Sequence, residues 1–385
     1  MHAYLRYAKE RRPDIVRFIR SLVEIESPSD SPASVNRLCE WIVAETRDIA
    51  RPRVVKAKGF GNHLRLEFTL PGRRKSGQVL GLGHSDTVWP LGTLARMPFR
   101  SREGRLWGPG VLDMKAGLAF YIYATRLVRD LDVAVPHKVV LLIVSDEEIG
   151  SKSSRPVVEA EAKRSDYVLV VEPGTGLTGK LKTARKGVGH YVISITGKPS
   201  HAGIDFAAGA SAILEAARQV ERVASFTNLP RGITVNPGVI RGGTRSNVVA
   251  AEAQIEVDIR IARLRDAASL DKKFRTLRPV DKRCSVEVEG SLNRPPMERT
   301  NAIARLFGNA RKLAAELNVQ LEESSTGGGS DGNFTAGLGV PTLDGLGAVG
   351  EGAHATNESI LIDRIPDRVA LLAMLLTSGA YGVAQ

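Results

Sequence analysis

The chain has 385 residues, more than one hydrophobic core usually organises, so we expect two domains or one elaborated domain. Hydrophobic residues make up 43% of the sequence, which excludes a disordered or fibrous protein. The formal net charge is +12, and the basic residues are scattered along the chain. This pattern indicates a solvated surface that attracts anionic substrates, and it argues against a nucleic-acid partner.

The cysteines and the apolar runs of the sequence indicate in which cellular compartment the protein is expected. Cys39 and Cys284 lie far apart without the spacing of metal ligands, so we expect two reduced thiols. Residues Met1–Arg12 are polar, and no run of about 18 apolar residues occurs anywhere. We therefore expect no transmembrane helix, no membrane partner and a cytoplasmic location.

The first part of the chain alternates between helical and strand patterns. Helical periodicity predicts a helix after Arg12-Pro13, a helix over Ser34–Ile49 and a helix from Met114 to about Asp130. Alternation of apolar and polar residues predicts a half-buried strand over Leu64–Leu70, and continuous apolar runs predict buried strands over Val79–Gly83, Val139–Val144 and Tyr167–Val171. Apolar strands separated by helices predict an α/β domain, with a mostly parallel sheet covered by helices on both faces.

The pattern changes at about residue 183. Alternating strands and helices follow in the order β-α-β-β-α-β, with the helices predicted over Ala207–Ala224 and Asp266–Leu277. This order is typical of a small ferredoxin-like α+β domain. A helix over Ala302–Leu317 and a strand over Pro341–Gly345 then resume the first pattern. We predict a first domain over 1–182 and 293–385, with an inserted domain over 183–292.

Polar side chains follow three of the predicted strands of the first domain. His84 and Asp86 follow one strand, Glu147 and Glu148 another, and Glu172 the third. Ligands of open α/β sheets bind outside the carboxyl ends of the strands, so these side chains predict one site. Taken singly, each has an ordinary explanation, such as a buried histidine or a solvated acidic loop.

Two further residues complete a possible metal centre. Asp113 precedes a predicted helix, where it is either the helix N-cap or a carboxylate that bridges two cations. His354 lies in a glycine-rich loop, where a lone histidine is usually only exposed. If Asp113 bridges, two metals each receive three protein ligands and keep open positions, as catalytic zinc requires. Nitrogen and oxygen ligands without thiolate suit Zn²⁺, with Co²⁺ or Mn²⁺ as substitutes.

A set of motifs gives the sequence a family resemblance. From about Asp14 to the C-terminus it resembles the zinc-dependent aminoacylase/carboxypeptidase family, and most of all its glutamate carboxypeptidases (carboxypeptidase G type). The motifs occur in the family's order: GHSDTVWP, GPGVLDMKAG, SDEEIGS, VVEPG, GKPSHAG, RSNVVA, DIRIAR, TGGGSDGN and GAH.

The resemblance implies a role for each site residue. Asp113 would bridge two zinc ions, one completed by His84 and Glu172 and the other by Glu148 and His354. Glu147 would be the general base, and Asp86 would orient His84. His201 would stabilise the oxyanion in the active site of the partner subunit. The last role implies a homodimer formed through the inserted domain, which would also act as a lid.

The substrate carboxylate has its own expected contacts. Arg260 is either part of a cross-strand ion pair or a guanidinium fork that grips a carboxylate. The resemblance adds Asn247 as a substrate contact, and Gly328, Gly329 and Ser330 as backbone N–H groups beside the carboxylate.

These features predict a di-zinc hydrolase that cleaves the amide bond of N-acyl or peptidyl amino acids. The released C-terminal amino acid would be glutamate or another acidic one. The alternatives are an N-acyl amino-acid deacylase of the acetylornithine deacetylase or succinyl-diaminopimelate desuccinylase type, a di- or tripeptidase, and a non-catalytic binding relic of the fold.

Overall fold

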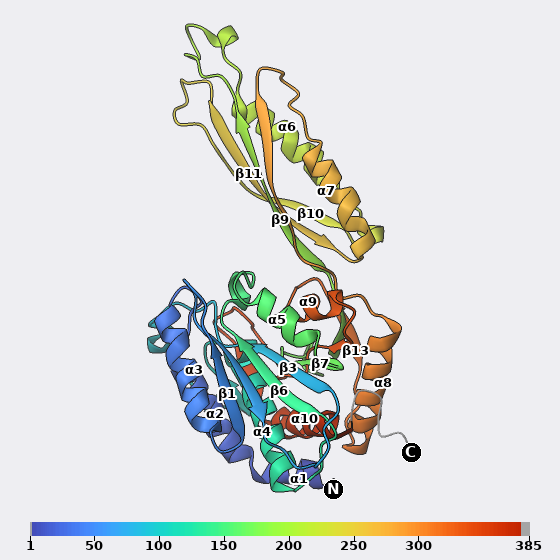
Figure 1. The fold of residues 1–385 in the computed structure, drawn as a ribbon. Helices are drawn as coiled ribbons and strands as arrows, with labels where there is room; N and C mark the ends of the chain where they lie inside the picture. Colours follow the sequence, from blue (N-terminus) through green and yellow to red (C-terminus); the bar gives the residue numbers. More distant parts are fainter. Residues whose placement is uncertain (1, 379–385) are drawn as a thin grey trace. The chain divides into compact units, whose positions relative to one another are not determined.

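The structure is a computed structural model that describes residues 2–378 (Figure 1). The chain divides into two compact units. The first comprises Met1–Ala184, Arg299–Ser325 and Ser330–Gln385, and the second, inserted unit comprises Arg185–Glu298 and Thr326–Gly329. Within the described residues, no helix is both long and apolar enough to cross a bilayer.

A six-stranded sheet forms the centre of the first unit. Its strands, in spatial order, are β1 (Ala50–Val55), β2 (His63–Phe68), β6 (Lys138–Val144), β3 (Gln78–His84), β7 (Tyr167–Val170) and β14 (Thr342–Leu343). The last four run parallel, whereas β1 and β2 pair antiparallel at one edge. The predicted mostly parallel sheet is thus confirmed.

Helices cover both faces of this sheet, also as predicted. One face packs against α2 (Arg12–Glu24), α3 (Pro32–Thr46), α4 (Ala116–Asp130), α8 (Asn301–Glu316) and α10 (Ile365–Ser378). The other face packs against α5 (Arg155–Ala162) and α9 (Gly332–Gly337) (Figure 1). Neighbouring strand residues alternate between these two cores: Val79 belongs to the first and Leu80 to the second.

Shorter elements complete the first unit. The helix α1 (Ala3–Glu10) lies against α10, and a small sheet consists of β4 (Arg100–Arg102), β5 (Arg105–Trp107), β15 (Gly350–Glu351) and β16 (Ser359–Leu361). The strands β8 (Leu181–Arg185) and β13 (Glu323–Thr326) form a separate pair.

The inserted unit has the predicted ferredoxin-like order. Its elements are β9 (Gly187–Thr196), α6 (Ala212–Ala224), β10 (Thr234–Gly242), β11 (Glu252–Ile261), α7 (Ala267–Arg275) and β12 (Ser285–Arg294). The sheet order is β10-β11-β9-β12, with every pairing antiparallel. Apolar residues on one side of the strands pack with both helices into a separate core, and the alternate residues of β11 are polar.

Several helix boundaries differ from the prediction. The helix predicted over Ser34–Ile49 is Pro32–Thr46, because proline at its start favours helical backbone there. The one predicted over Ala207–Ala224 starts at Ala212, where the side chain of Ser211 accepts a hydrogen bond from the Leu214 N–H. The helix predicted over Asp266–Leu277 is shorter at both ends, Ala267–Arg275.

The start of α4 is also later than predicted, which changes the interpretation of Asp113. Asp113 and Met114 have non-helical backbone angles, and the residue that caps α4 is Lys115. The N-cap interpretation of Asp113 is therefore wrong: its carboxylate is not committed to the end of a helix.

Candidate metal centre

The site lies at the carboxyl edge of the parallel strands of the first unit. His84 ends β3, Glu147 and Glu148 follow β6 in the short turn η3 (Glu147–Ile149), and Glu172 follows β7. The strand β3 pairs in parallel with both β6 and β7, so the ends of these three strands are neighbours.

Two loops bring the remaining ligands to this edge. Asp113 comes from the turn η2 (Val111–Lys115), which precedes α4, and His354 comes from the loop between β15 and β16. His354 has a positive φ of 62°, a backbone conformation that costs free energy for any residue but glycine. Such conformations concentrate at functional sites.

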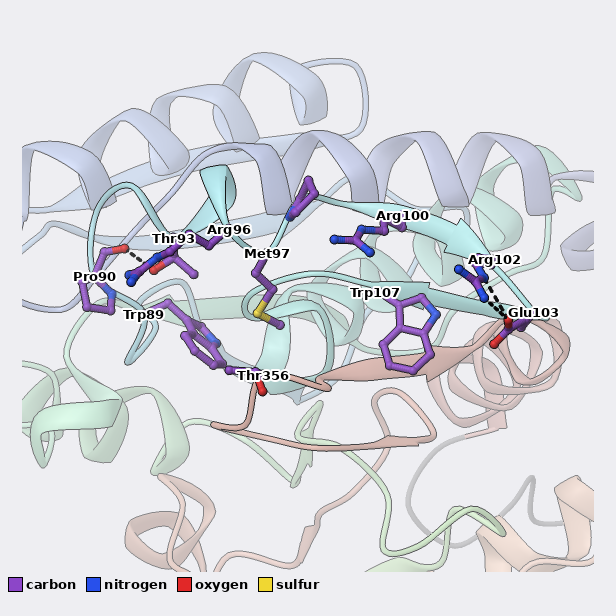
Figure 2. Close-up of a pocket in the computed structure, with 11 residues that line it drawn as sticks. Trp89, Pro90, Thr93, Arg96, Met97, Arg100, Arg102, Glu103, Trp107 and Thr356 are labelled. Carbon is purple, nitrogen blue, oxygen red and sulfur yellow. Dashed lines mark hydrogen bonds and ion pairs between the residues drawn. The ribbon is translucent and has the colours of Figure 1, made fainter.

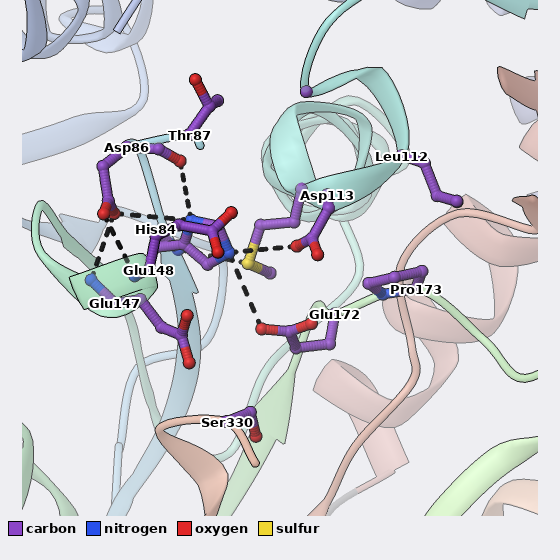
Figure 3. A network of polar contacts seen from close by, with 12 residues as sticks. His84, Asp86, Thr87, Leu112, Asp113, Glu147, Glu148, Glu172, Pro173 and Ser330 are labelled. Carbon is purple, nitrogen blue, oxygen red and sulfur yellow. Dashed lines mark hydrogen bonds and ion pairs between the residues drawn. The ribbon is translucent and has the colours of Figure 1, made fainter. Parts of the chain in front are cut away.

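Two groups of possible ligands share the carboxylate of Asp113. Its Oδ1 lies 3.2 Å from His84 Nε2, which is itself 3.7 Å from Glu172 Oε1 (Figure 3). Its Oδ2 lies 3.3 Å from His354 Nε2, which is 3.3 Å from Glu148 Oε2. Within each group, all ligand atoms lie within 4.8 Å of one another.

This spacing fits a metal ion. Donor atoms about 2.0–2.1 Å from a tetrahedral Zn²⁺ lie about 3.4 Å from one another, close to the distances between these side chains. The second carboxylate oxygen of Glu148 is buried and has no hydrogen-bond partner among residues 2–378. A buried carboxylate oxygen without a donor is costly, and a cation would satisfy it.

The electrostatics of the site point the same way. Hydrogen bonds to Asp113 and Glu148 raise the pKa of His354 to about 10. Burial alone would lower the pKa of His84, but its bonds to Asp113 and Asp86 raise it well above the usual value. The same two histidines lower the pKa of Asp113 against the effect of burial. The carboxylates thus favour positive charge nearby. Protons on His84 and His354 provide this charge when no metal cation is bound.

Asp86 supports both halves of the site. Its main-chain carbonyl lies 2.9 Å from His84 Nδ1, nearer than its own carboxylate at 3.5 Å. The carboxylate accepts a hydrogen bond from Ser29 Oγ at 2.7 Å. It also accepts hydrogen bonds from the N–H groups of Glu147 and Glu148 at 3.2 Å (Figure 3). Asp86 therefore orients His84 mainly through its backbone, and its side chain fixes the turn that carries both glutamates.

Sequence reasoning missed Glu358, a fully buried residue. Its carboxylate accepts hydrogen bonds from the N–H groups of Gly110, Leu112 and Asp113 and from the indole N–H of Trp89. Burial raises the pKa of Glu358, although these four donors oppose the shift. Glu358 thereby holds the loop that presents Asp113, and no local pattern signals a contact between residues about 245 positions apart.

The other predicted site residues have different surroundings. His201 and Asn247 belong to the inserted unit, where both are exposed and the Asn247 carbonyl accepts a hydrogen bond from the Ala202 N–H. Arg260, also in the inserted unit, donates Nε and Nη2 to the carboxylate of Asp258, two residues away on β11, and Nη1 to the carbonyl of Gly327.

The glycine loop presents carbonyl groups to arginine. The carbonyls of Gly328 and Gly329 accept hydrogen bonds from the buried Arg185 at 3.2 and 2.9 Å. Ser330 belongs to the first unit and is fully buried; its hydroxyl donates to Asp344 and its N–H to Asn333.

Comparison with known proteins places the chain in a family. Residues 81–378 match Peptidase family M20/M25/M40. The chain is 30% identical over 379 residues to carboxypeptidase G2 of Pseudomonas sp. (strain RS-16), covering 96% of this chain and 90% of that protein. It is also 30% identical over 304 residues to a succinyl-diaminopimelate desuccinylase of Azoarcus sp. (strain BH72), covering 74% of this chain and 78% of that protein.

The fold comparison agrees. The crystal structure of aminopeptidase PepT from Bacillus cereus ATCC 10987 has a TM-score of 0.79, with 22% identity, over 95% of this chain and 98% of that chain. Together with two ligand groups that share one carboxylate, these matches show that the chain belongs to peptidase family M20/M25/M40 and is a metal-dependent peptidase or amidohydrolase.

Proposed function

We propose that the protein is a di-zinc hydrolase that releases a C-terminal amino acid, preferably glutamate or another acidic one, from N-acyl or peptidyl conjugates. The observation that carries the proposal is the pair of three-residue ligand groups joined by Asp113, with Glu147 next to the ligand Glu148. Co²⁺ or Mn²⁺ would substitute for Zn²⁺ at the same ligands.

The metal and the surrounding side chains would have separate roles in the reaction. Bound zinc supplies Lewis acidity to the scissile carbonyl and to water. Glu147 takes a proton from the attacking water and delivers it to the leaving amine, and Asp86 keeps the Glu147 turn in place through its carboxylate. Glu358 fixes the backbone on both sides of Leu112 and so limits the movement of Asp113.

His201 would stabilise the tetrahedral oxyanion in a partner subunit. A dimer through the inserted unit, for which the proposed boundaries are 183–292, is supported by exposed apolar side chains. Ile204 and Phe206, close to His201 in the sequence, are 82% and 65% exposed, and Leu214 on α6 and Ile240 on β10 are exposed as well. Exposed apolar side chains in this number favour burial against another protein surface.

Arg260 would bind the substrate carboxylate, with Asn247 and the segment from Gly328 to Ser330 as further contacts. The bidentate ion pair with Asp258 supports this proposal, because it holds the guanidinium in the two-pronged geometry that binds a carboxylate. On binding, the substrate carboxylate would replace the carboxylate of Asp258 at the Arg260 guanidinium. The net charge of +12 also favours an anionic substrate.

A deacylase of the desuccinylase type is the second candidate, because one such enzyme reaches the same 30% identity as carboxypeptidase G2 over a shorter match. A hydrolysis screen with N-acyl and peptidyl conjugates of glutamate, aspartate, alanine, arginine and ornithine separates the two. Preferred release of glutamate or aspartate supports the proposal. Preferred release from acetyl or succinyl conjugates of basic amino acids supports the deacylase.

The variant Glu147→Gln tests the general base. It should keep the bound zinc and lose about 10²–10⁴ in turnover. Metal analysis of the purified variant is the necessary control, because a loss of zinc would explain the loss of turnover without any role for Glu147. Full turnover with zinc bound would refute the assignment, and absence of turnover in the unaltered zinc-loaded protein would favour a binding relic.

A further inference from the structure

A pocket of about 570 Å³ lies in the first unit, lined by none of the residues assigned above to metal or substrate (Figure 2). Its walls come from the segment after Asp86 and from β4 and β5, and Thr356 contributes from the loop that also carries His354. Small-molecule sites are typically clefts of about 300–1,000 Å³, so the pocket has the size of a ligand site.

One wall of the pocket is aromatic and apolar. Trp89 and Trp107, two of the three tryptophans in the chain, line it with Met97 between them (Figure 2). The indole N–H of Trp89 donates to the buried carboxylate of Glu358 at 2.8 Å, which fixes the orientation of this ring. A wall of two indole rings, one of them held by a hydrogen bond, and a thioether favours a flat, aromatic ligand over a flexible polar one.

The charged side chains of the lining are mostly basic. Three arginines, Arg96, Arg100 and Arg102, contribute to it together with one carboxylate, Glu103. Glu103 pairs with Arg102 through two hydrogen bonds of 2.6 and 2.8 Å. Over residues 2–378, neither Arg96 nor Arg100 forms an ion pair. Two exposed guanidinium groups without an ion pair, beside an aromatic wall, are complementary to a carboxylate.

We propose that this pocket binds a small aromatic carboxylate, with the ring against Trp89, Met97 and Trp107 and the carboxylate at Arg96 and Arg100. None of the residues that line the pocket is a candidate metal ligand, so binding there needs no bound metal. The proposal therefore stands or falls independently of the hydrolase activity.

Isothermal titration calorimetry with 2-naphthoate tests the proposal. The full-length, zinc-loaded protein is titrated with 2-naphthoate and with 2-naphthalenemethanol, an uncharged molecule of nearly the same shape. We expect 2-naphthoate to bind about tenfold more tightly, since a charge-assisted contact is worth about one such factor. Both titrations are repeated after treatment with EDTA. Binding that disappears with the metal would place the carboxylate on the metal centre and overturn the proposal.

Variants then locate the site. Arg96→Gln/Arg100→Gln should weaken 2-naphthoate about tenfold and leave 2-naphthalenemethanol unchanged. The matched control is Arg51→Gln/Arg53→Gln, which removes the same charge from exposed positions on β1 of the same unit and should leave both affinities unchanged. Trp107→Leu should weaken both molecules. Equal effects of the two double variants, or no effect of the first, would overturn the proposal.

Discussion

Replacing Glu358 with glutamine should weaken the first unit and loosen its hold on metal. Each carboxylate oxygen accepts two hydrogen bonds: one from Trp89 and Gly110, the other from Leu112 and Asp113. A glutamine keeps only one oxygen, and its amide nitrogen is itself a donor. In either orientation, two of the four buried donors therefore lose their acceptor.

The magnitude follows from this count. A hydrogen bond to a charged group contributes about 1.5–3 kcal/mol, so two of them amount to about 3–6 kcal/mol of unfolding free energy. The lower end applies, because burial raises the pKa of Glu358 and so opposes its ionised form. The loop that carries Asp113 also loses its anchor. Substitution of groups that support metal ligands typically costs about 10–100-fold in metal affinity.

Two measurements check this expectation. Tryptophan fluorescence during urea unfolding reports the first unit, since Trp41, Trp89 and Trp107 all lie there. Competition with a chelator gives the zinc affinity. The control is Glu351→Gln, which removes a half-exposed carboxylate paired with Arg105 and should cost about 0–1 kcal/mol. If Glu358→Gln behaves like this control in both assays, the anchoring role is refuted.

Three further predictions test other parts of the structure. Glu172→Gln should remove one metal per chain whereas Asp113→Asn should remove both, and metal analysis showing equal losses would contradict a shared carboxylate. Arg260→Gln should raise KM for glutamate conjugates about tenfold, whereas Asp258→Asn, which frees the guanidinium, should lower it; steady-state kinetics in which both changes act in the same direction would contradict carboxylate exchange. Burial lowers the pKa of His137 in the folded protein. As pH falls below about 6.5, His137 is therefore protonated in the unfolded chain before it is protonated in the folded one, and the free energy of unfolding decreases. His137→Gln should flatten that slope between pH 7.5 and 5.5 in urea unfolding, and an unchanged slope would assign it to other groups.

The parts of the fold and site that sequence could predict are those with local causes. Apolar runs such as Val139–Val144 marked the buried strands, and the parallel arrangement then brought His84, Glu148 and Glu172 to one edge. The alternation of apolar and polar residues along β11 is likewise a local pattern, and it accounts for the buried and the polar face of the inserted sheet.

What sequence could not predict depends on contacts between distant segments. The acidic side chain of Glu358 has no periodic or motif context, and its role exists only because the η2 loop folds onto it. The N-cap interpretation of Asp113 failed for a related reason: the helix pattern continued through Met114, but the loop is held in a non-helical conformation. For Arg260, the cross-strand ion pair was one of two alternatives, and the ion pair that forms is a different one: Asp258 lies on the same strand and the same face.

The division of the central sheet between two cores has an evolutionary consequence. Along β3, Val79 packs with the helices of one layer, whereas Leu80 and Leu82 pack with those of the other. A substitution at Val79 is therefore compensated by a change in one helix layer, and a substitution at Leu80 by a change in the other layer. This holds although the two residues are adjacent in the sequence. Among homologues, odd and even positions of this strand should covary with separate sets of helices. The residues on each face of the sheet should therefore change independently of the other face, while the metal ligands at the edge of the sheet are retained.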